Sequence, residues 1–297
     1  MAVIDATLVK QLRDRTGAGV MDCKRTLVET QGDLDAAVDL LRAAEAARSA
    51  RKADRVAAEG LVSLVVQGHE GALVELNTET DFVARTEAFQ SAAAAFVRLA
   101  LGVHGDRNAL LDAPAPDDDG RVSDVVARLG ARTGEHVHLR RSGFVSVEQG
   151  VVASYLHNVV APGLGRIGVL IALESQGSAV ALLDIGRKMA MHIAASSPLW
   201  VSREDVPPDT VLEKRAELTR EAHATGKPAA IVEKMVEGRM RRFYEEVVLG
   251  MQPFVLNPQQ RVDAALHDAE QLAGAKIEIK AFVRFQTGDG IEKATTA

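Results

Sequence analysis

Apolar positions near the start of the chain repeat with the period of an α-helix. The clearest stripe has intervals of three and four residues and consists of Leu34, Ala37, Val38 and Leu41. Such spacing places side chains on one face of a helix. Shorter stripes fall within residues 8–12 and 20–28, and glycine-containing breaks separate the three. Residues 6–50 are therefore predicted to form three short helices, with Asp33 capping the last by accepting backbone N–H groups.

Beyond Gly60 the apolar pattern changes to that of strands. Two apolar runs, 61–66 and 72–76, flank the turn 68–71 and predict a β-hairpin. A long helix is expected next, from Asp81 to Leu101. Further along, the pattern predicts helices near 122–129, 179–196 and 259–272 and strands near 136–147, 151–157, 167–173 and 277–285. Helices and hairpin strands in separate blocks favour an α+β fold over a doubly wound parallel sheet.

Residues 209–250 show two amphipathic stretches joined by a tight turn that ends at Pro228, a residue suited to the start of a helix. The apolar residues expected to line the pair are Val211, Leu212, Leu218, Ala222, Val232, Met235, Met240, Phe243 and Val247. The pattern predicts an antiparallel helical hairpin. Such a hairpin has little core of its own, so it must pack against its own domain or a second copy of the chain. The segment 252–258 that follows is expected to be extended.

The charge balance limits the classes of partner. The formal net charge is -6, from 35 Lys and Arg against 41 Asp and Glu. This argues against direct nucleic-acid binding, which depends on cations that meet phosphates, and against an anionic membrane surface. Cys23 is the only cysteine, so no disulfide within the chain and no cysteine-rich zinc site is expected. The start lacks the pattern of a secretory signal and no apolar run reaches the ~20 residues of a membrane span, so the expected location is the cytoplasm.

The segment Gly163-Leu-Gly-Arg-Ile-Gly168 matches the glycine pattern of dinucleotide-binding folds, and Asp184 follows at the matching distance. That pattern must open a helix, whereas here it opens a strand-like run, so its context argues against a cofactor site. A nucleotide- or dinucleotide-binding enzyme that uses residues 163–168 is the alternative function. The phosphate-binding loop of triphosphatases and the nucleophile elbow of hydrolases do not occur. No catalytic residue, metal site or cofactor is predicted.

Some polar and thiol side chains have a plain structural interpretation. His136 and His138 would share one face of a strand and could hold a metal, but no third ligand is evident. His192 lies on an apolar helix and Cys23 has apolar neighbours, so packing roles are favoured. His157 ends a predicted strand before the glycine-rich loop, a position more typical of function.

Phe82 supports two interpretations. Phe82, Phe89 and Phe96 recur every seven residues, so the period favours Phe82 as the first core residue of the predicted helix. The other interpretation starts from Asp81, a carboxylate at the helix start, where free N–H groups favour negative charge. A Phe in that first turn can project past the domain and serve as an interface anchor.

Two longer motifs are specific. They are residues 8–24, LVKQLRDRTGAGVMDCK, and residues 80–85, TDFVAR. Supporting motifs lie at 154–157 (SYLH), 167–170 (IGVL), 190–196 (AMHIAAS), 234–240 (KMVEGRM) and 252–256 (QPFVL). Together they resemble, in order and between Thr7 and Lys293, the bacterial elongation factor Ts family, whose members exchange nucleotide on the GTPase elongation factor Tu.

The resemblance implies a three-helix ubiquitin-associated-like domain and a core of two α+β subdomains, the second interrupted by an antiparallel coiled-coil hairpin. The implied division is 1–50 for the helical domain, 51–59 for a basic linker, 60–150 for core subdomain N, 151–202 and 250–290 for core subdomain C, 203–249 for the hairpin and 291–297 for the tail. In some members this hairpin takes part in dimerisation, so a homodimer through it is one of the arrangements that the resemblance allows, and the sequence leaves the oligomeric state open. Some members carry a further C-terminal helix that embraces the GTPase, and that contact is expected to be absent here.

The implied activity is nucleotide exchange, not bond chemistry, so the chain is not expected to be an enzyme. In the family the Asp-Phe pair, here Asp81 and Phe82, wedges into the nucleotide domain of elongation factor Tu, and Thr80 to Val83 is the magnesium-dislodging region. The partner would be bound with GDP or free of nucleotide. GDP and Mg²⁺ bind tightly because the cation and loop amides meet phosphate charge. A partner that holds those loops open competes with both ligands, and the weakening is reciprocal.

Further partner contacts are implied where residues match the family. They are Leu12, Arg13, Val20, Met21 and Lys24 in the helical domain, Leu129 and Gly130 near the nucleotide loop, His157, and Val255 and Leu256 against a more distant domain of the GTPase. The loop after His157 is longer than in the shortest members. Besides the exchange factor and the nucleotide- or dinucleotide-binding enzyme, a third class of function is a purely structural helical scaffold. An assay of GDP release separates the scaffold from the exchange factor.

Overall fold

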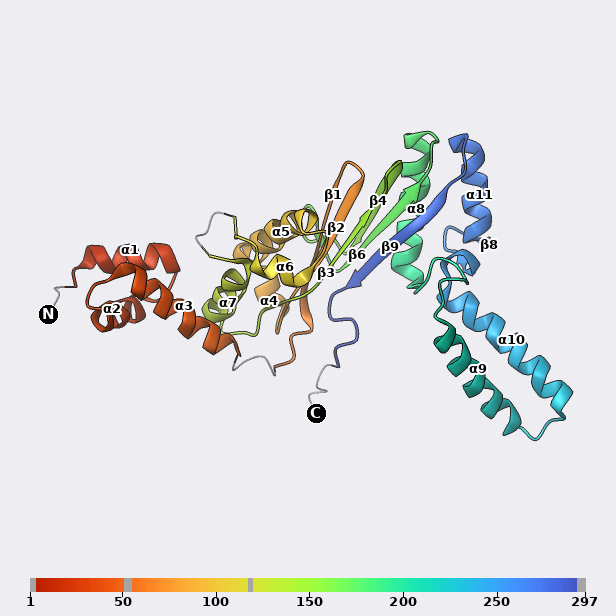
Figure 1. Ribbon diagram of the computed structural model, residues 1–297, viewed down its shortest axis with the longest axis horizontal. Helices are drawn as coiled ribbons and strands as arrows, with labels where there is room; N and C mark the ends of the chain where they lie inside the picture. The colour runs from red at the N-terminus through yellow and green to blue at the C-terminus, as the bar shows by residue number, and fades with distance from the viewer. Residues whose placement is uncertain (1–3, 51–54, 117–119, 293–297) are drawn as a thin grey trace.

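The computed structural model describes residues 4–50, 55–116 and 120–292. These residues form an elongated molecule, with three helices at one end, two sheets in the middle and a pair of helices at the other end (Figure 1). The expected linker at 51–59 and the expected tail at 291–297 lie partly outside the described residues.

The N-terminal helices are α1 (Ala6–Thr16), α2 (Val20–Glu29) and α3 (Leu34–Ala50), as predicted. Gly17 ends α1 with a φ of 70°, a left-handed conformation that glycine adopts without strain. The carboxylate of Asp33 accepts the N–H groups of Asp35 and Ala36, each at 3.0 Å, which confirms the predicted cap. Cys23 is fully buried in the helical core, and burial raises the pKa of its thiol, so its packing role is confirmed. The other buried members of this core are Leu12, Leu27, Ala37, Val38 and Leu41.

The first sheet has the strand order β3-β2-β1-β5, with all neighbours antiparallel. Its strands are β1 (Glu59–Gln67), β2 (Glu70–Thr78), β3 (His138–Ser146) and β5 (Leu164–Gly165). β1 and β2 form the predicted hairpin, which turns through Gly68 at a φ of 61°. Three helices pack with this sheet around Phe89 and Phe96: α5 (Glu87–Gly102), α6 (Arg107–Asp112) and α7 (Val122–Thr133). The pattern does not predict α6, because six residues are too few to show a helical period.

The second sheet has the strand order β4-β6-β9, again antiparallel. Its strands are β4 (Gly150–His157), β6 (Ile167–Glu174) and β9 (Glu278–Gln286). Helices α8 (Ala179–Ser196) and α11 (Val262–Ala273) cover one face, and the other face packs on the first sheet. Gly168 permits the close approach of the sheets, because a Cβ there would lie 2.7 Å from Val62 and 2.8 Å from Leu73. The α+β class is therefore confirmed.

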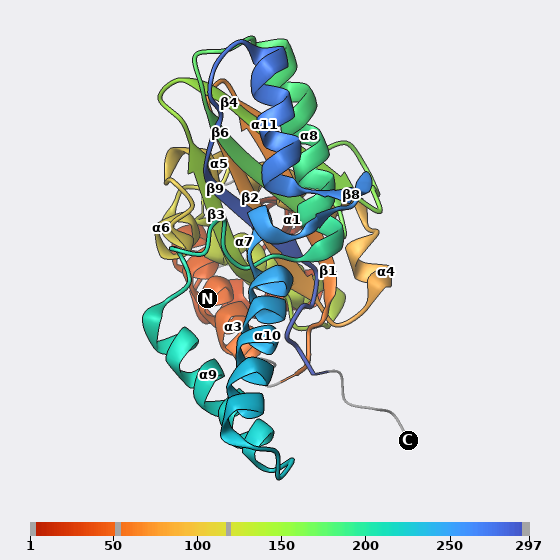
Figure 2. The ribbon, with the colours of Figure 1, turned by 90° about the vertical axis from the view of Figure 1, so that its right-hand side faces the viewer.

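The predicted helical hairpin is formed by α9 (Pro208–His223) and α10 (Ala229–Val247). It projects away from the sheets, as Figures 1 and 2 show. Its core includes Leu218, Ala222, Val232, Val236, Met240 and Tyr244. Leu212 was expected to line this core, and that prediction is wrong, because 65% of the residue is exposed. Val211 packs against the core, and each further residue turns about 100° around a helix, which carries Leu212 away from α10.

The chain returns from the hairpin to the second sheet through a short irregular region. It comprises the 3₁₀ turn η1 (Leu249–Met251) and a two-stranded ribbon, β7 (Pro253–Phe254) and β8 (Asn257–Arg261). The expected extended segment at 252–258 thus folds back on itself. Helix α11 begins at Val262 and not near 259, because residues 257–261 pair with β7.

The expected single helix from Asp81 to Leu101 is wrong. The chain forms a one-turn helix, α4 (Asp81–Ala84), breaks, and then starts α5. The hydroxyl of Thr86 causes the break, since it donates to the Val83 carbonyl at 2.7 Å and accepts the Phe89 N–H at 3.4 Å as the cap of α5. Phe82 therefore leaves the helical register of Phe89.

Candidate partner-binding surface

The Thr80–Val83 corner joins β2 to α5 and carries the most exposed Phe, Tyr or Trp side chain among the described residues. Phe82 is 80% exposed, whereas Phe89 is fully buried. The next two residues, Val83 and Ala84, are 8% and 3% exposed and belong to the core of the first sheet. The interpretation of Phe82 as a core residue is therefore wrong, and the corner presents it to solvent on a packed base.

Glu135, which follows α7, holds the start of this corner. Its Oε2 accepts the Thr80 N–H at 3.0 Å and the Thr78 hydroxyl at 2.7 Å, and its Oε1 accepts the Thr80 hydroxyl at 2.6 Å. Burial acts to raise the pKa of Glu135, but the hydrogen bonds from Thr80 and Thr78 outweigh it and hold the pKa below its usual range. The carboxylate is thus ionised at neutral pH. The sequence does not predict this role of Glu135, because no regular spacing connects it with Thr80, 55 residues away.

Asp81 is held by a side chain rather than by a helix dipole. α4 has only four residues, and its N-cap residue Thr80 makes no side-chain capping bond. Arg85 donates to the Asp81 carboxylate at 2.9 Å, one turn along the chain. Both side chains are exposed, so the pair contributes only about 0.3–0.5 kcal/mol. Its effect is to orient the carboxylate beside Phe82.

The Val255–Leu256 turn, between β7 and β8, is a second exposed apolar tip. Val255 is 43% exposed and Leu256 is 49% exposed. Behind them His192 is fully buried, and its Nδ1 accepts the Val255 N–H at 3.1 Å. Its Nε2 lies 2.8 Å from Oε1 of Gln252 and must donate, because Nδ1 is the acceptor. Burial lowers the pKa of His192 although the bond to Gln252 acts in the other direction, so the imidazole is neutral. The predicted buried, hydrogen-bonded His192 is confirmed.

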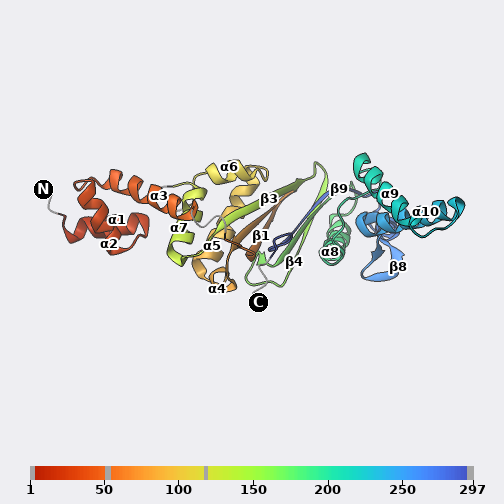
Figure 3. The same cartoon turned by 90° about the horizontal axis from the view of Figure 1, so that it is seen from below.

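These two tips lie on one side of the molecule. α4 and β8 project in the same direction in both Figure 2 and Figure 3, whereas α9 lies on the opposite side. A single large partner could therefore touch both tips at once without meeting α9.

The helical domain also exposes a mixed apolar and cationic surface. A groove of about 510 Å³ is lined by Val9, Arg13, Val20 and Lys24, among others. Met21 is 76% exposed at the start of α2. Arg13, Val20, Met21 and Lys24 thus share an accessible region. Leu12 does not, because it is fully buried in the helical core.

The structure places the remaining expected contacts at different depths. Leu129 is 6% exposed and Gly130 is buried, and a Cβ at Gly130 would lie 2.9 Å from the Glu135 carbonyl oxygen. Gly130 therefore lies against the segment that carries Glu135, and Leu129 belongs to the core of the first sheet. Neither is presented to solvent. His157 is exposed, with Nδ1 3.2 Å from the Tyr155 hydroxyl.

The loop after His157 approaches the Thr80–Val83 corner. A groove of about 520 Å³ between them is lined by Asp81, Arg85, Asn158, Val160 and Arg166, among others. Val159 and Val160 are exposed next to this groove. Sequence reasoning does not single out these two valines, since isolated apolar residues in a loop give no signal.

The glycines at 163–168 do not form a phosphate-binding turn. They lead into strand β6, and no helix follows them. Gly163 has a φ of 75° in the turn before β5, Gly165 lies against the His157 carbonyl oxygen, and Gly168 serves sheet packing. The structure therefore offers this segment no helix N-terminus for a pyrophosphate, and the nucleotide-site interpretation loses its basis.

His136 and His138 do not form a metal site with other ligands. Their rings stack with centroids 4.8 Å apart. The pKa of His138 falls to about 4, chiefly because it is buried and secondly because His136 lies beside it. Across residues 4–50, 55–116 and 120–292, no group of three or more His, Cys, Asp and Glu side chains could hold a metal ion.

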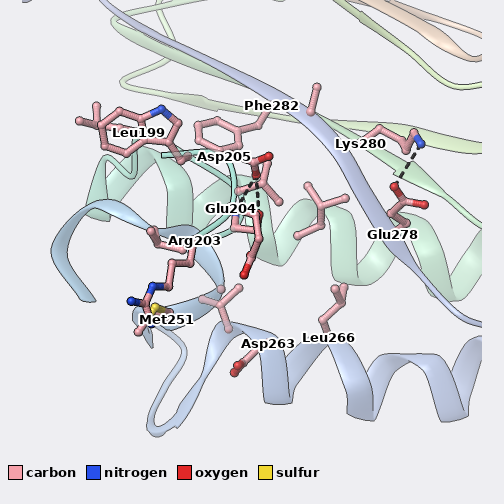
Figure 4. Close-up of a pocket in the computed structure, with 18 of the residues that line it drawn as sticks. Leu199, Arg203, Glu204, Asp205, Met251, Asp263, Leu266, Glu278, Lys280 and Phe282 are labelled. Atoms are coloured by element: carbon pink, nitrogen blue, oxygen red, sulfur yellow. Dashed lines mark hydrogen bonds and ion pairs between the residues drawn. The ribbon is translucent and has the colours of Figure 1, made fainter. Parts of the chain in front are cut away.

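A cavity of about 770 Å³ lies between β9, α11 and residues 199–205 (Figure 4). Two of its polar pairs are internal: Lys280 donates to Glu278 at 3.1 Å, and the Ser202 hydroxyl donates to Asp205 at 2.8 Å. None of the expected partner contacts lines it. In the described part of the chain, no helix is long and apolar enough to cross a membrane.

Comparisons with known proteins identify the family. The family model described as Elongation factor TS matches residues 79–289. The elongation factor Ts of Parvibaculum lavamentivorans is 50% identical over 293 residues, covering 99% of this chain and 95% of that relative. Those of Rhodospirillum rubrum and Rhizobium etli are 49% and 47% identical over 294 and 296 residues, covering 99% and 100% of this chain and 95% and 96% of the relatives.

The α+β fold and these matches define the protein as a translation elongation factor. The chain belongs to the elongation factor Ts family.

Proposed function

We propose that this protein is a guanine nucleotide exchange factor that binds GDP-bound and nucleotide-free elongation factor Tu and promotes GDP release without making or breaking covalent bonds. The observation that carries the proposal is Phe82, which is 80% exposed on a corner whose neighbours are fixed on both sides. Membership of the elongation factor Ts family points to elongation factor Tu as the partner, and Phe82 on this corner is the side chain proposed to enter it.

The packing of the corner suits it to act as a wedge. Val83 and Ala84 are buried beneath Phe82, so a force on the ring is transmitted to the core of the first sheet. Asp81 stands beside the ring as a fixed negative charge. Inserted near the nucleotide, the Thr80–Val83 corner would displace Mg²⁺ and open the loops around GDP. Each 1.4 kcal/mol or so removed from the barrier to release raises its rate about tenfold.

Other contacts would provide the binding energy that the wedge uses. Strand β8, which follows the Val255–Leu256 turn, lies on the same side as α4 (Figure 2). An accessible region on the helical domain is formed by Arg13, Val20, Met21 and Lys24. His157 adds an exposed polar contact. Leu12, Leu129 and Gly130 are buried, so we assign them the role of supporting the contact residues from beneath.

A release assay tests the proposal. Elongation factor Tu loaded with labelled GDP is mixed with excess unlabelled GDP, with and without micromolar amounts of this protein. We expect release to become faster by orders of magnitude in the presence of Mg²⁺. The gain should shrink when a chelator removes Mg²⁺ beforehand, because the ion is no longer there to displace. Equal release rates with and without the protein in Mg²⁺ would contradict the proposal.

We also propose the division into a helical domain (1–50), core subdomains (60–150, and 151–202 with 250–290) and hairpin (203–249). An apolar cluster centred in each of these parts supports it. Leu164 of β5 joins the cluster of the first sheet, and a further cluster packs the two sheets together. A homodimer through the hairpin is proposed because Leu212 and Ile231 remain 65% and 46% exposed on it. Light scattering should give twice the chain mass, and Leu212→Glu should return it to one. A single-chain mass for the unaltered protein excludes the dimer.

A further inference from the structure

The corner that carries Phe82 is tied to a segment far away in the sequence. Glu79 and Thr80 on one segment are hydrogen-bonded to Glu135 and His136 on the other, each time from a backbone N–H to a side-chain carboxylate. The Glu135 carboxylate accepts the Thr80 N–H at 3.0 Å, and the Glu79 carboxylate accepts the His136 N–H at 2.5 Å. The two segments therefore hold each other in a fixed register just where β2 ends and before β3 begins.

The Glu135 carboxylate accepts hydrogen bonds from the end of β2 and from the start of the Thr80–Val83 corner. Its two oxygens receive the Thr78 hydroxyl, the Thr80 hydroxyl and the Thr80 N–H at 2.6 to 3.0 Å. We call these three bonds between Glu135, Thr78 and Thr80 the clamp. Thr78 is fully buried, so the clamp is anchored in the first sheet. Hydrogen bonds to an ionised carboxylate are about twice as strong as those between neutral groups.

The Thr80 hydroxyl has been diverted from its ordinary local role. An N-cap threonine usually accepts an N–H group of its own helix, yet Thr80 makes no such bond to α4. Its hydroxyl donates to Glu135 instead. The start of α4 is therefore held by Glu135 and not by a cap of its own helix.

We propose that Glu135 is a positioning residue for nucleotide exchange: by holding Thr80 it fixes the direction in which Phe82 enters the partner, without touching the partner itself. This inference rests on the proposed exchange function. A loose corner would have to be ordered during insertion, and that ordering costs free energy which a fixed corner does not lose. The effect should fall on the maximal stimulated rate of GDP release and not on docking, because the other contacts remain.

The test uses the full chain and labelled GDP on elongation factor Tu. In Glu135→Gln the negative charge is lost, and the Thr80 hydroxyl must turn to accept from the amide NH₂ group instead of donating. The bonds that hold Thr80 are then no longer charge-assisted, so the hold on Thr80 is weakened. We expect the maximal stimulated rate to fall about tenfold, with the half-saturating concentration changed by less than about twofold. Thr80→Val removes one donor of the same clamp and should lower the rate by about threefold. The matched control is Glu270→Gln, which removes a carboxylate that accepts the Ile277 N–H at 3.1 Å away from this surface, and it should behave as the unaltered protein does.

A double-mutant cycle separates positioning from a general effect on folding. In a Phe82→Ala background, Glu135→Gln should lower the rate no further, because the clamp acts only through Phe82. Equal losses in both backgrounds would overturn the inference, and so would an unchanged rate in Glu135→Gln. If Glu135→Gln does not fold, Thr80→Val carries the same cycle. Absence of stimulation by the unaltered protein is a different result, since it removes the exchange function itself.

Discussion

Two exposed apolar tips, the Thr80–Val83 corner and the Val255–Leu256 turn, share one side of the molecule but are held by opposite chemistry. The corner is fixed by the ionised carboxylate of Glu135. The turn is fixed by the neutral imidazole of His192, which accepts the Val255 N–H and is itself oriented by Gln252. In both cases a side chain that is distant in the sequence accepts a backbone N–H of the tip.

Because one supporting group is an ionised carboxylate and the other a neutral imidazole, the two tips should respond differently to a fall in pH. The carboxylate of Glu135 is partly buried and makes charge-assisted bonds, and these persist until the group is protonated. His192 is fully buried and its Nδ1 can accept only while the ring is neutral. Protonation would put two donors, Nδ1–H and the Val255 N–H, face to face. The turn is thus the more sensitive of the two tips to acid.

The largest expected effect separates Phe82 from its helical neighbours. Phe89→Ala should lower the free energy of unfolding by about 3–5 kcal/mol, because it opens a cavity in the core of the first sheet. Phe82→Ala should change it by less than about 0.5 kcal/mol, because that ring is exposed. Urea denaturation followed by circular dichroism measures both. A large loss of stability in Phe82→Ala would return the residue to the core.

The next effect concerns the support of the second tip. His192→Leu should lower the free energy of unfolding by about 2–3 kcal/mol, because the Gln252 carbonyl and the Val255 N–H lose their partner in a buried place. Amide hydrogen exchange should become faster at Val255. Exchange at Thr80 serves as the internal control and should stay unchanged. If Thr80 loosens equally, the two tips are not independent.

The pH dependence should divide the two tips. Both supporting groups have a lowered pKa in the folded protein, so the unfolded chain binds more protons and stability is lost as the pH falls. For His192 the loss starts below the ordinary imidazole pKa of about 6.5, and for Glu135 below the ordinary carboxyl pKa of about 4.3. Each is complete once the pH has fallen through the folded pKa.

Unfolding free energies measured between about pH 7 and pH 3 test this order. The fall between about pH 6.5 and 5 should be smaller in His192→Leu than in the unaltered protein, whereas Glu135→Gln should reduce only the fall below about pH 4.3. His138, with a pKa of about 4, also contributes to the loss of stability below about pH 6.5. Its contribution is the same in every variant, so it cancels when a variant is compared with the unaltered protein. The reverse assignment of the two windows would contradict the comparison.

The smallest effect lies in the second tip's own side chains. Leu256→Ala should raise the half-saturating concentration for stimulated GDP release about fivefold, as expected for an exposed contact away from the centre of an interface. Its maximal rate should stay the same, because the turn docks but does not enter the nucleotide site. The control is Leu272→Ala, which shortens a side chain that is 79% exposed on α11. A lowered maximal rate in Leu256→Ala would assign the turn a part in exchange itself.

The sequence predicts what repeated spacing encodes. The three N-terminal helices, the β1–β2 hairpin and the hairpin of α9 and α10 all follow from long periodic runs or clear turn residues. Phe82 shows where spacing fails, because the hydroxyl of Thr86 ends α4 and no pattern signals that break. Motif resemblance, and not periodicity, indicated that Phe82 is exposed.

Contacts between distant segments were beyond the reach of sequence spacing. Glu135 meets Thr80 because β2 and β3 pair in the first sheet, which brings the end of β2 beside the segment that precedes β3. Gly168 fits a dinucleotide motif by spacing, and only the packing of the two sheets shows why a Cβ is excluded there. Leu129 and Gly130 match family contact positions, yet Leu129 is buried in the core of the first sheet and Gly130 lies against the Glu135 backbone.

The most direct test of the wedge compares the maximal rate of GDP release from elongation factor Tu with the unaltered protein and with Phe82→Ala, each at saturating concentration. We predict a loss of about a hundredfold in stimulated rate with the fold intact, the size expected when an interface anchor worth 2–3 kcal/mol is removed. Val180→Ala, which shortens another side chain that is 80% exposed, should retain the full rate. A Phe82→Ala protein that stimulates release as fast as the unaltered one would contradict the claim that this corner opens the nucleotide site.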